Sequence, residues 1–103
     1  MIVQWSKEAR LDVEKALEYG LSFGRAAVSR FSKEIDDVQD LLEQNPKLGF
    51  VDSSLLNKAH IYRCLILRRY KVVYYLDEEK DVINIVAFFN TWQNPDKLMD
   101  YIE

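Results

Sequence analysis

The feature that most constrains this chain is a regular apolar pattern between Gly24 and Pro46. Large apolar residues recur there at spacings of three, four, three and four, at Val28, Phe31, Ile35, Val38 and Leu42. This period places their side chains on one face of an α-helix of several turns. Pro46 and Gly49 end the helix, because proline cannot extend its hydrogen-bond ladder and glycine favours a turn. Such a helix must pack its apolar face against another element.

The preceding residues predict a strand followed by a second helix. Residues 2–5 are rich in β-forming side chains, and Ser6 has the character of a helix N-cap. Apolar residues then recur at helical spacing as far as about residue 20. Gly20 and Gly24 bracket a short turn, which makes the two helices a hairpin.

The second half of the chain changes to short β-rich runs. Residues 50–58 are expected to be a loop, and strands are expected at about residues 60–67, 70–76 and 81–89, joined by hairpin turns. A short helix is expected after Pro95. The order β-α-α-β-β-β(-α) predicts an α+β fold, with the helical hairpin on one face of a small, mostly antiparallel sheet. Residues 1–103 are expected to form a single domain.

Composition excludes several classes of protein. The chain has 103 residues, of which 49% are hydrophobic and 30% charged, which is typical of a globular domain. We expect neither a secretory signal nor a membrane span. One cysteine excludes an internal disulfide framework, so a cytoplasmic protein is expected. The net charge of -3 argues against attraction of the whole surface to nucleic acid.

Positive charge is nevertheless concentrated in one region. No acidic residue occurs between Asp52 and Asp77, and the basic residues of this interval are Lys58, Arg63, Arg68, Arg69 and Lys71. If Arg63 and Lys71 both point away from the helices, they form a cationic spot on the uncovered sheet face, suited to phosphates or acidic side chains. The alternative interpretation is that these cations serve solubility and protect a sheet edge.

The sequence gives little support to a metal site or a phosphate-binding loop. His60 and Cys64 are too few for a zinc site, and no phosphate-binding glycine loop occurs. Cys64 is expected to be a small buried thiol, and His60 a structural residue. The carboxylates of Asp36, Asp37 and Asp40 are expected to form a solvated helix face. We therefore expect no metal and no cofactor.

Three stretches in order, "LLEQNPKLG", "YRCLILRRYKVVYYLDEEKDVINIVAFF" and "NTWQNPDKL", give the whole chain a resemblance to the RelE/ParE superfamily of bacterial type II toxins. Such proteins, often called plasmid-stabilisation proteins, are encoded beside an antitoxin that wraps and neutralises them. The resemblance implies one of two activities. The RelE-like branch cuts mRNA on the ribosome without metal, whereas the ParE-like branch inhibits DNA gyrase.

The RelE-like catalytic residues are only partly present. Arg63 matches one basic position of that branch and Lys71 replaces an arginine, but Leu65 occupies the other basic position. Trp92 stands where the tail arginine is expected, and Leu98 stands near the expected tyrosine. Loss of one charged group in such a site costs roughly 10² to 10³ in rate. A ParE-like, non-enzymatic inhibitor is therefore favoured, with Arg63 and Lys71 as the catalytic candidates if the protein is an endoribonuclease.

The resemblance also implies the partners. We expect a cognate antitoxin and a cellular target, with gyrase favoured over the ribosome and mRNA, and no membrane. An inactive homologue that acts only in an antitoxin complex is the third alternative. The residues expected to contact the target or the antitoxin are Arg63, Arg68, Arg69, Lys71 and Trp92. A homodimer and a heterotetramer with the antitoxin both remain open.

Overall fold

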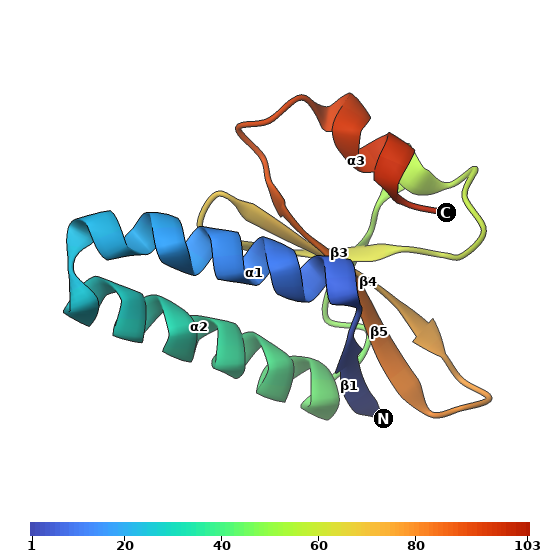
Figure 1. Cartoon of the computed structure of the whole chain (residues 1–103). Helices are drawn as coiled ribbons and strands as arrows, with labels where there is room; N and C mark the ends of the chain where they lie inside the picture. Colours follow the sequence, from blue (N-terminus) through green and yellow to red (C-terminus); the bar gives the residue numbers. More distant parts are fainter.

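The computed structural model describes residues 1–103 as a five-stranded sheet with helices on both of its faces (Figure 1). In chain order the main elements are β1 (Ile2–Trp5), α1 (Lys7–Gly20), α2 (Arg25–Gln44), β2 (Phe50–Val51), β3 (Arg63–Leu67), β4 (Tyr70–Asp77), β5 (Val82–Asn90) and α3 (Pro95–Tyr101). The α+β class and the expected sequence of long elements are confirmed.

The strands lie in the order β1-β5-β4-β3-β2. β1 runs parallel to β5, and all other neighbours are antiparallel. The expectation of a loop over residues 50–58 is wrong in part, because β2 pairs with β3 at the sheet edge and a 3-10 turn follows at Ser53–Leu55. A two-residue strand is too short to show a period in the sequence. β3 also begins three residues later than expected, at Arg63.

The helical hairpin forms as its local sequence predicts. The Ser6 side chain accepts a hydrogen bond from the Ala9 N–H at 3.0 Å, which caps α1. A 3-10 turn at Leu21–Phe23 follows α1, and Gly24 then takes a φ of 100°, a left-handed value that glycine adopts without steric cost. Figure 1 shows α1 and α2 lying side by side on the same face of the sheet.

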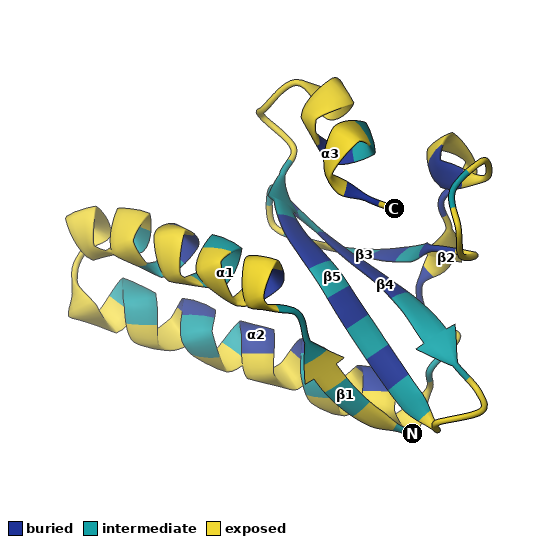
Figure 2. Ribbon diagram, turned by 45° about the vertical axis from the view of Figure 1, so that its right-hand side comes forward, coloured by how far each residue is buried: buried dark blue, intermediate teal, exposed yellow.

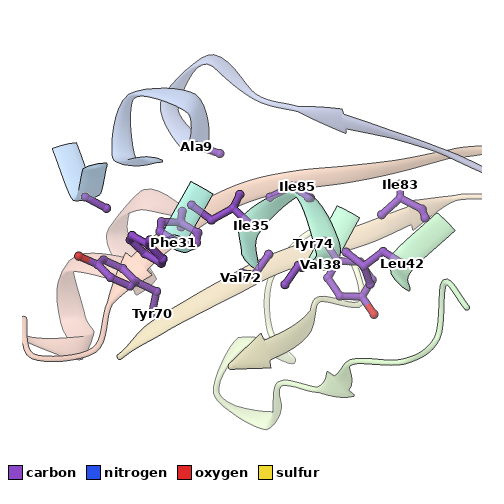
Figure 3. Close-up of a cluster of buried hydrophobic side chains, with 12 residues drawn as sticks. Ala9, Phe31, Ile35, Val38, Leu42, Tyr70, Val72, Tyr74, Ile83 and Ile85 are labelled. Atoms are coloured by element: carbon purple, nitrogen blue, oxygen red, sulfur yellow. The ribbon is translucent and has the colours of Figure 1, made fainter. Parts of the chain in front are cut away.

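The larger of two hydrophobic clusters lies between this hairpin and the sheet (Figure 3). The apolar stripe of α2 contributes Phe31, Ile35, Val38 and Leu42, which pack against residues of β4 and β5. The rings of Tyr70 and Phe88 stack with centroids 4.6 Å apart. Periodicity therefore predicted the buried face of α2 correctly.

A second hydrophobic cluster covers the opposite face, which was expected to carry polar residues, a ligand or a partner. Its buried members are Leu55, Tyr62, Cys64, Val73, Ala87, Leu98 and Ile102. Figure 2 shows α3 on the side of the sheet away from α1 and α2. Burying a large aliphatic side chain such as Leu98 contributes roughly 1.5–3 kcal/mol. The far face is thus largely occupied by the chain itself.

A β-bulge in β5 divides its aromatic residues between the two clusters. Val73 pairs with Ala87 and Tyr74 pairs with Ile85, so the register shifts between these two pairs. The extra residue reverses the alternation of faces along β5. Phe88 therefore joins the helix-side cluster, whereas Phe89 packs against the second cluster.

Candidate functional site

Arg63 and Lys71, the two cations expected to share one spot, project from opposite faces of the sheet. Arg63 lies opposite Tyr74 in the β3–β4 register, whereas Lys71 lies opposite Ile66. Directly opposed residues of antiparallel strands project to the same face. Tyr74 belongs to the cluster beneath the helices, so Arg63 points to the helix side and Lys71 to the far side. The prediction that Arg63 and Lys71 form one cationic spot is therefore wrong.

The hairpin turn explains this separation. Leu67 pairs with Tyr70 across a two-residue turn, so odd-numbered residues of β3 share a face with even-numbered residues of β4. A register shift of one residue would have reversed the faces. The sequence pattern alone did not fix this register.

Arg63 holds the loop that follows α2. Its Nη1 donates a hydrogen bond to the Gly49 carbonyl at 2.8 Å and a longer one to the Lys47 carbonyl at 3.4 Å. The guanidinium thereby satisfies backbone carbonyls just beyond the end of a helix. Arg63 has a structural contact of its own in this molecule.

Lys71 belongs to a buried polar cluster centred on Asp52. Its Nζ lies 3.0 Å from Asp52 Oδ2, which also accepts a hydrogen bond from Cys64 Sγ at 3.1 Å. Ser54 donates to Asp52 Oδ1 from its backbone N–H at 3.0 Å and from its hydroxyl at 2.6 Å. Burial acts to raise the pKa of Asp52, but the hydrogen bonds from Ser54, Cys64 and Lys71 lower this pKa to about 2. The cluster fastens the segment after β2 to the sheet.

Arg68, in the turn between β3 and β4, pairs with α2. Its guanidinium forms an ion pair with Glu34 and lies 4.6 Å from the centroid of the Phe31 ring. Its φ of 56° lies in the left-handed region, so the backbone there is mildly strained. About half of its side chain remains exposed. Arg68 therefore remains partly accessible, beside Arg69 in the same turn.

Arg69 and Trp92, both predicted contact residues, are brought together beside Tyr19. The Arg69 guanidinium carbon lies 4.4 Å from the Trp92 ring centroid and 4.6 Å from that of Tyr19. Such distances are those of cation–π contacts. No carboxylate forms a salt bridge with Arg69, whereas Arg68 and Lys71 both have acidic partners. Arg69 is thus a fixed cation without a balancing anion.

Two shallow cavities flank this arginine, with volumes of about 340 Å³ and 310 Å³. Both are lined by Tyr19, Arg69, Tyr70 and Trp92. Trp92 is 77% exposed, and Phe23, which lines the smaller cavity, is 68% exposed. We call the surface formed by Tyr19, Phe23, Arg68, Arg69 and Trp92 the Arg69 surface. Exposed aromatic side chains around a fixed cation are typical of a protein-binding site.

Tyr19 and Phe23 were not predicted as site residues. Tyr19 lies in the last turn of α1 and Phe23 lies in the 3-10 turn, and their rings meet edge-on with centroids 5.6 Å apart. The signal available in the sequence was a pair of large aromatic residues beside the turn glycines, off the apolar stripe of the first helix. The fold was needed to show that this turn lies beside Trp92.

The remaining predicted residues take ordinary positions. Cys64 is fully buried, as expected, and burial together with its bond to Asp52 raises the pKa of its thiol. Phe89 is partly buried against the second cluster. His60 is exposed and stacks on Tyr75, with ring centroids 3.8 Å apart. No group of three His, Cys, Asp or Glu side chains is positioned to hold a metal ion.

Comparison with known proteins defines the class. A family model described as "ParE toxin of type II toxin-antitoxin system, parDE" matches residues 3–95. The chain therefore belongs to the ParE toxin family of type II toxin–antitoxin systems, and a cognate antitoxin is its implied partner. No curated protein matches the sequence. No helix combines the length and apolarity needed to cross a bilayer.

Proposed function

We propose that this toxin stops growth by binding a protein target, DNA gyrase, through the Arg69 surface, and that its antitoxin neutralises it by covering the same surface. The observation that carries the proposal is the Arg69 guanidinium, which contacts the rings of Tyr19 and Trp92 and has no acidic partner. The gyrase assignment comes from the ParE-like branch that the sequence resembles.

The composition of this surface supports a protein partner. Arginine, tryptophan and tyrosine are the residues that most often dominate the energy of protein interfaces. Arg69 Nη2 donates one long hydrogen bond, to the Tyr70 hydroxyl at 3.5 Å, and the other N–H groups of the guanidinium remain for a carboxylate. Two cavities beside it offer space for side chains of the partner. An acidic and apolar segment would complement these features.

The geometry gives little support to an endoribonuclease. Such an enzyme needs several cations around one scissile phosphate. Arg63 and Lys71 project from opposite faces, and both are engaged, with backbone carbonyls and with Asp52 respectively. A protein-binding activity uses the groups that remain available at the surface.

The test compares three variants of the full chain with wild type: Arg69→Ala, Trp92→Ala and the control Arg10→Ala, which removes an exposed cation from α1. Growth after induction without antitoxin, supercoiling by purified gyrase and trapping of cleaved DNA are measured for each. We expect Arg69→Ala and Trp92→Ala each to raise, at least tenfold, the toxin dose that is needed to stop growth and to inhibit supercoiling. Arg10→Ala should behave as wild type.

Antitoxin binding is measured on the same variants by titration calorimetry. A shared surface predicts that Arg69→Ala and Trp92→Ala also weaken this affinity. Full toxicity in both variants would overturn the role of the Arg69 surface. Growth arrest with unaltered supercoiling would overturn gyrase as the target, and new mRNA ends mapped by primer extension would then assign the toxin to the endoribonuclease class.

A further inference from the structure

A third cavity, of about 440 Å³, lies away from the Arg69 surface and shares no lining residue with it. The residues that surround it come from the start of α1, the segment before β3, β4, β5, the end of α3 and the two residues after α3. Its chemically distinctive lining residues are Glu8, His60, Tyr62, Tyr75, Tyr101 and Glu103. Its volume falls within the range of small-ligand sites.

The aromatic part of this lining has a defined arrangement. The rings of His60 and Tyr75 are parallel within 2°, with centroids 3.8 Å apart. The Tyr62 ring meets both of them edge-on, at 5.6 Å from Tyr75 and 5.9 Å from His60. Tyr62 is buried, and its hydroxyl donates to the Glu103 carbonyl at 3.1 Å. These contacts hold the rings in place before any ligand arrives.

The charged residues that line the cavity are acidic. Glu8 and Glu103 line the cavity, and neither lysine nor arginine does. Burial, and then the proximity of Tyr75 and Glu103, raises the pKa of Tyr62. Burial, and then the charges of Asp12 and Glu8, raises the pKa of Tyr101. The carboxylates therefore disfavour further negative charge at the tyrosine oxygens and favour a positive charge nearby.

We propose that this cavity binds a guanidinium group. A flat guanidinium stacks against aromatic rings while its N–H groups donate to a carboxylate, here that of Glu8. The unbalanced carboxylates disfavour anions, and they give a cation an advantage over a purely apolar ligand at these aromatic rings. The guanidinium belongs either to an arginine side chain of a bound protein or to a free small molecule, and the two sources share this chemistry.

The test titrates the full chain with N-acetylarginine amide and, as the matched neutral probe, N-acetylcitrulline amide. Backbone NMR shifts locate the binding and calorimetry measures it. We expect the arginine probe to bind with a dissociation constant of about 1 mM, with the largest shifts at His60, Tyr62 and Tyr75. Glu8→Gln should weaken binding at least fivefold, and the control Glu14→Gln, also exposed on α1, should not.

Equal binding of the citrulline probe, shifts that map outside this cavity, or an unchanged affinity in Glu8→Gln would overturn the proposal. A second variant, His60→Ala, changes an exposed ring and keeps the proposal testable if Glu8→Gln alters the helix. Agmatine and an arginine-containing tripeptide then separate the two sources. A preference for the tripeptide assigns the site to a protein partner, and a preference for agmatine assigns it to a small molecule. Because the cavity is separate from the Arg69 surface, a negative result in this binding experiment leaves the proposed function unaffected.

Discussion

The hydroxyl of Tyr74 accepts a hydrogen bond from the backbone N–H of Gly49 at 2.8 Å. The same hydroxyl donates to the Pro46 carbonyl at 2.9 Å, so one buried tyrosine of β4 holds the loop between α2 and β2. This close approach leaves no room for a side chain at Gly49. A Cβ there would lie 2.7 Å from the Cys64 carbonyl oxygen and 2.8 Å from the Tyr74 hydroxyl.

We therefore expect Gly49→Ala to lower the free energy of unfolding by about 1–3 kcal/mol, the usual cost of overpacking. Gly20→Ala is the matched control, because a Cβ at this helical position would lie 3.4 Å from Val28 Cγ2, an ordinary contact. Alanine is also the better helix former. Urea denaturation of both variants measures the difference, and equal stabilities would contradict the close packing at Gly49.

The Asp52 cluster predicts a loss of stability in acid. The pKa of Asp52 in the folded protein is about 2, below its ordinary value of 3.8. The stabilisation is complete above about pH 4 and is lost as the pH falls towards 2, since the unfolded chain then binds a proton more readily. This difference in pKa between the folded and unfolded protein corresponds to about 2 kcal/mol in the free energy of unfolding.

Asp52→Asn should remove that part of the acid dependence and lower stability at pH 7. Urea denaturation of wild type and variant at pH 7, 4 and 2.5 provides the measurement. The variant at Asp36, Asp36→Asn, is the control, because this carboxylate is exposed on α2. Parallel pH curves for wild type and Asp52→Asn would show that Asp52 does not titrate as the geometry predicts.

Cys64 should resist alkylation in the folded protein. It is fully buried, its pKa is raised by burial and by the bond to Asp52, and the thiolate is the reactive form. We expect iodoacetamide to react at least ~100-fold more slowly than in the urea-unfolded chain, because reaction requires opening of the structure. Mass spectrometry over time measures both rates, and similar rates would place Cys64 in contact with solvent.

Arg68 and Arg69 should differ in their effects although they are neighbours. Arg68→Ala removes a partly exposed ion pair with Glu34 and the contact with Phe31, so it should cost about 1 kcal/mol or less. Arg69→Ala should lower the unfolding midpoint only slightly, because an exposed cation–π contact contributes little to stability, while it abolishes toxicity. Thermal unfolding of the two variants separates folding from function. A large loss of stability in Arg69→Ala would mean that its effect on growth arises from misfolding.

Periodicity in the sequence predicted the parts of the fold that depend on long regular patterns. The apolar stripe from Val28 to Leu42 gave the buried face of α2, and the Ser6 cap marked the start of α1 correctly. Periodicity could not predict the short elements, since β2 has only two residues and the bulge in β5, opposite Val73 and Tyr74, is a feature of strand pairing. Which side of the sheet α3 covers is likewise set by packing between distant segments.

The candidate site was likewise predictable from the sequence only in part. Arg69 was predicted as a contact residue from its place in the interval without acidic residues, and Trp92 from its place in the tail of the family pattern. Their contact could not be, because it depends on where the turn after β3 meets the segment after β5. The expected pairing of Arg63 with Lys71 failed on the parity of one hairpin register. Tyr19 could be assigned to the site only from the fold, which places the end of α1 beside Arg69.

The parallel pairing of β1 with β5 has a consequence for synthesis of the protein. Ile2 lies beside Val82, so the first strand made has no partner until nearly all of the toxin has left the ribosome. Contacts between such distant residues also slow folding. The sheet can therefore be completed only late in synthesis, after the last of its five strands has been made.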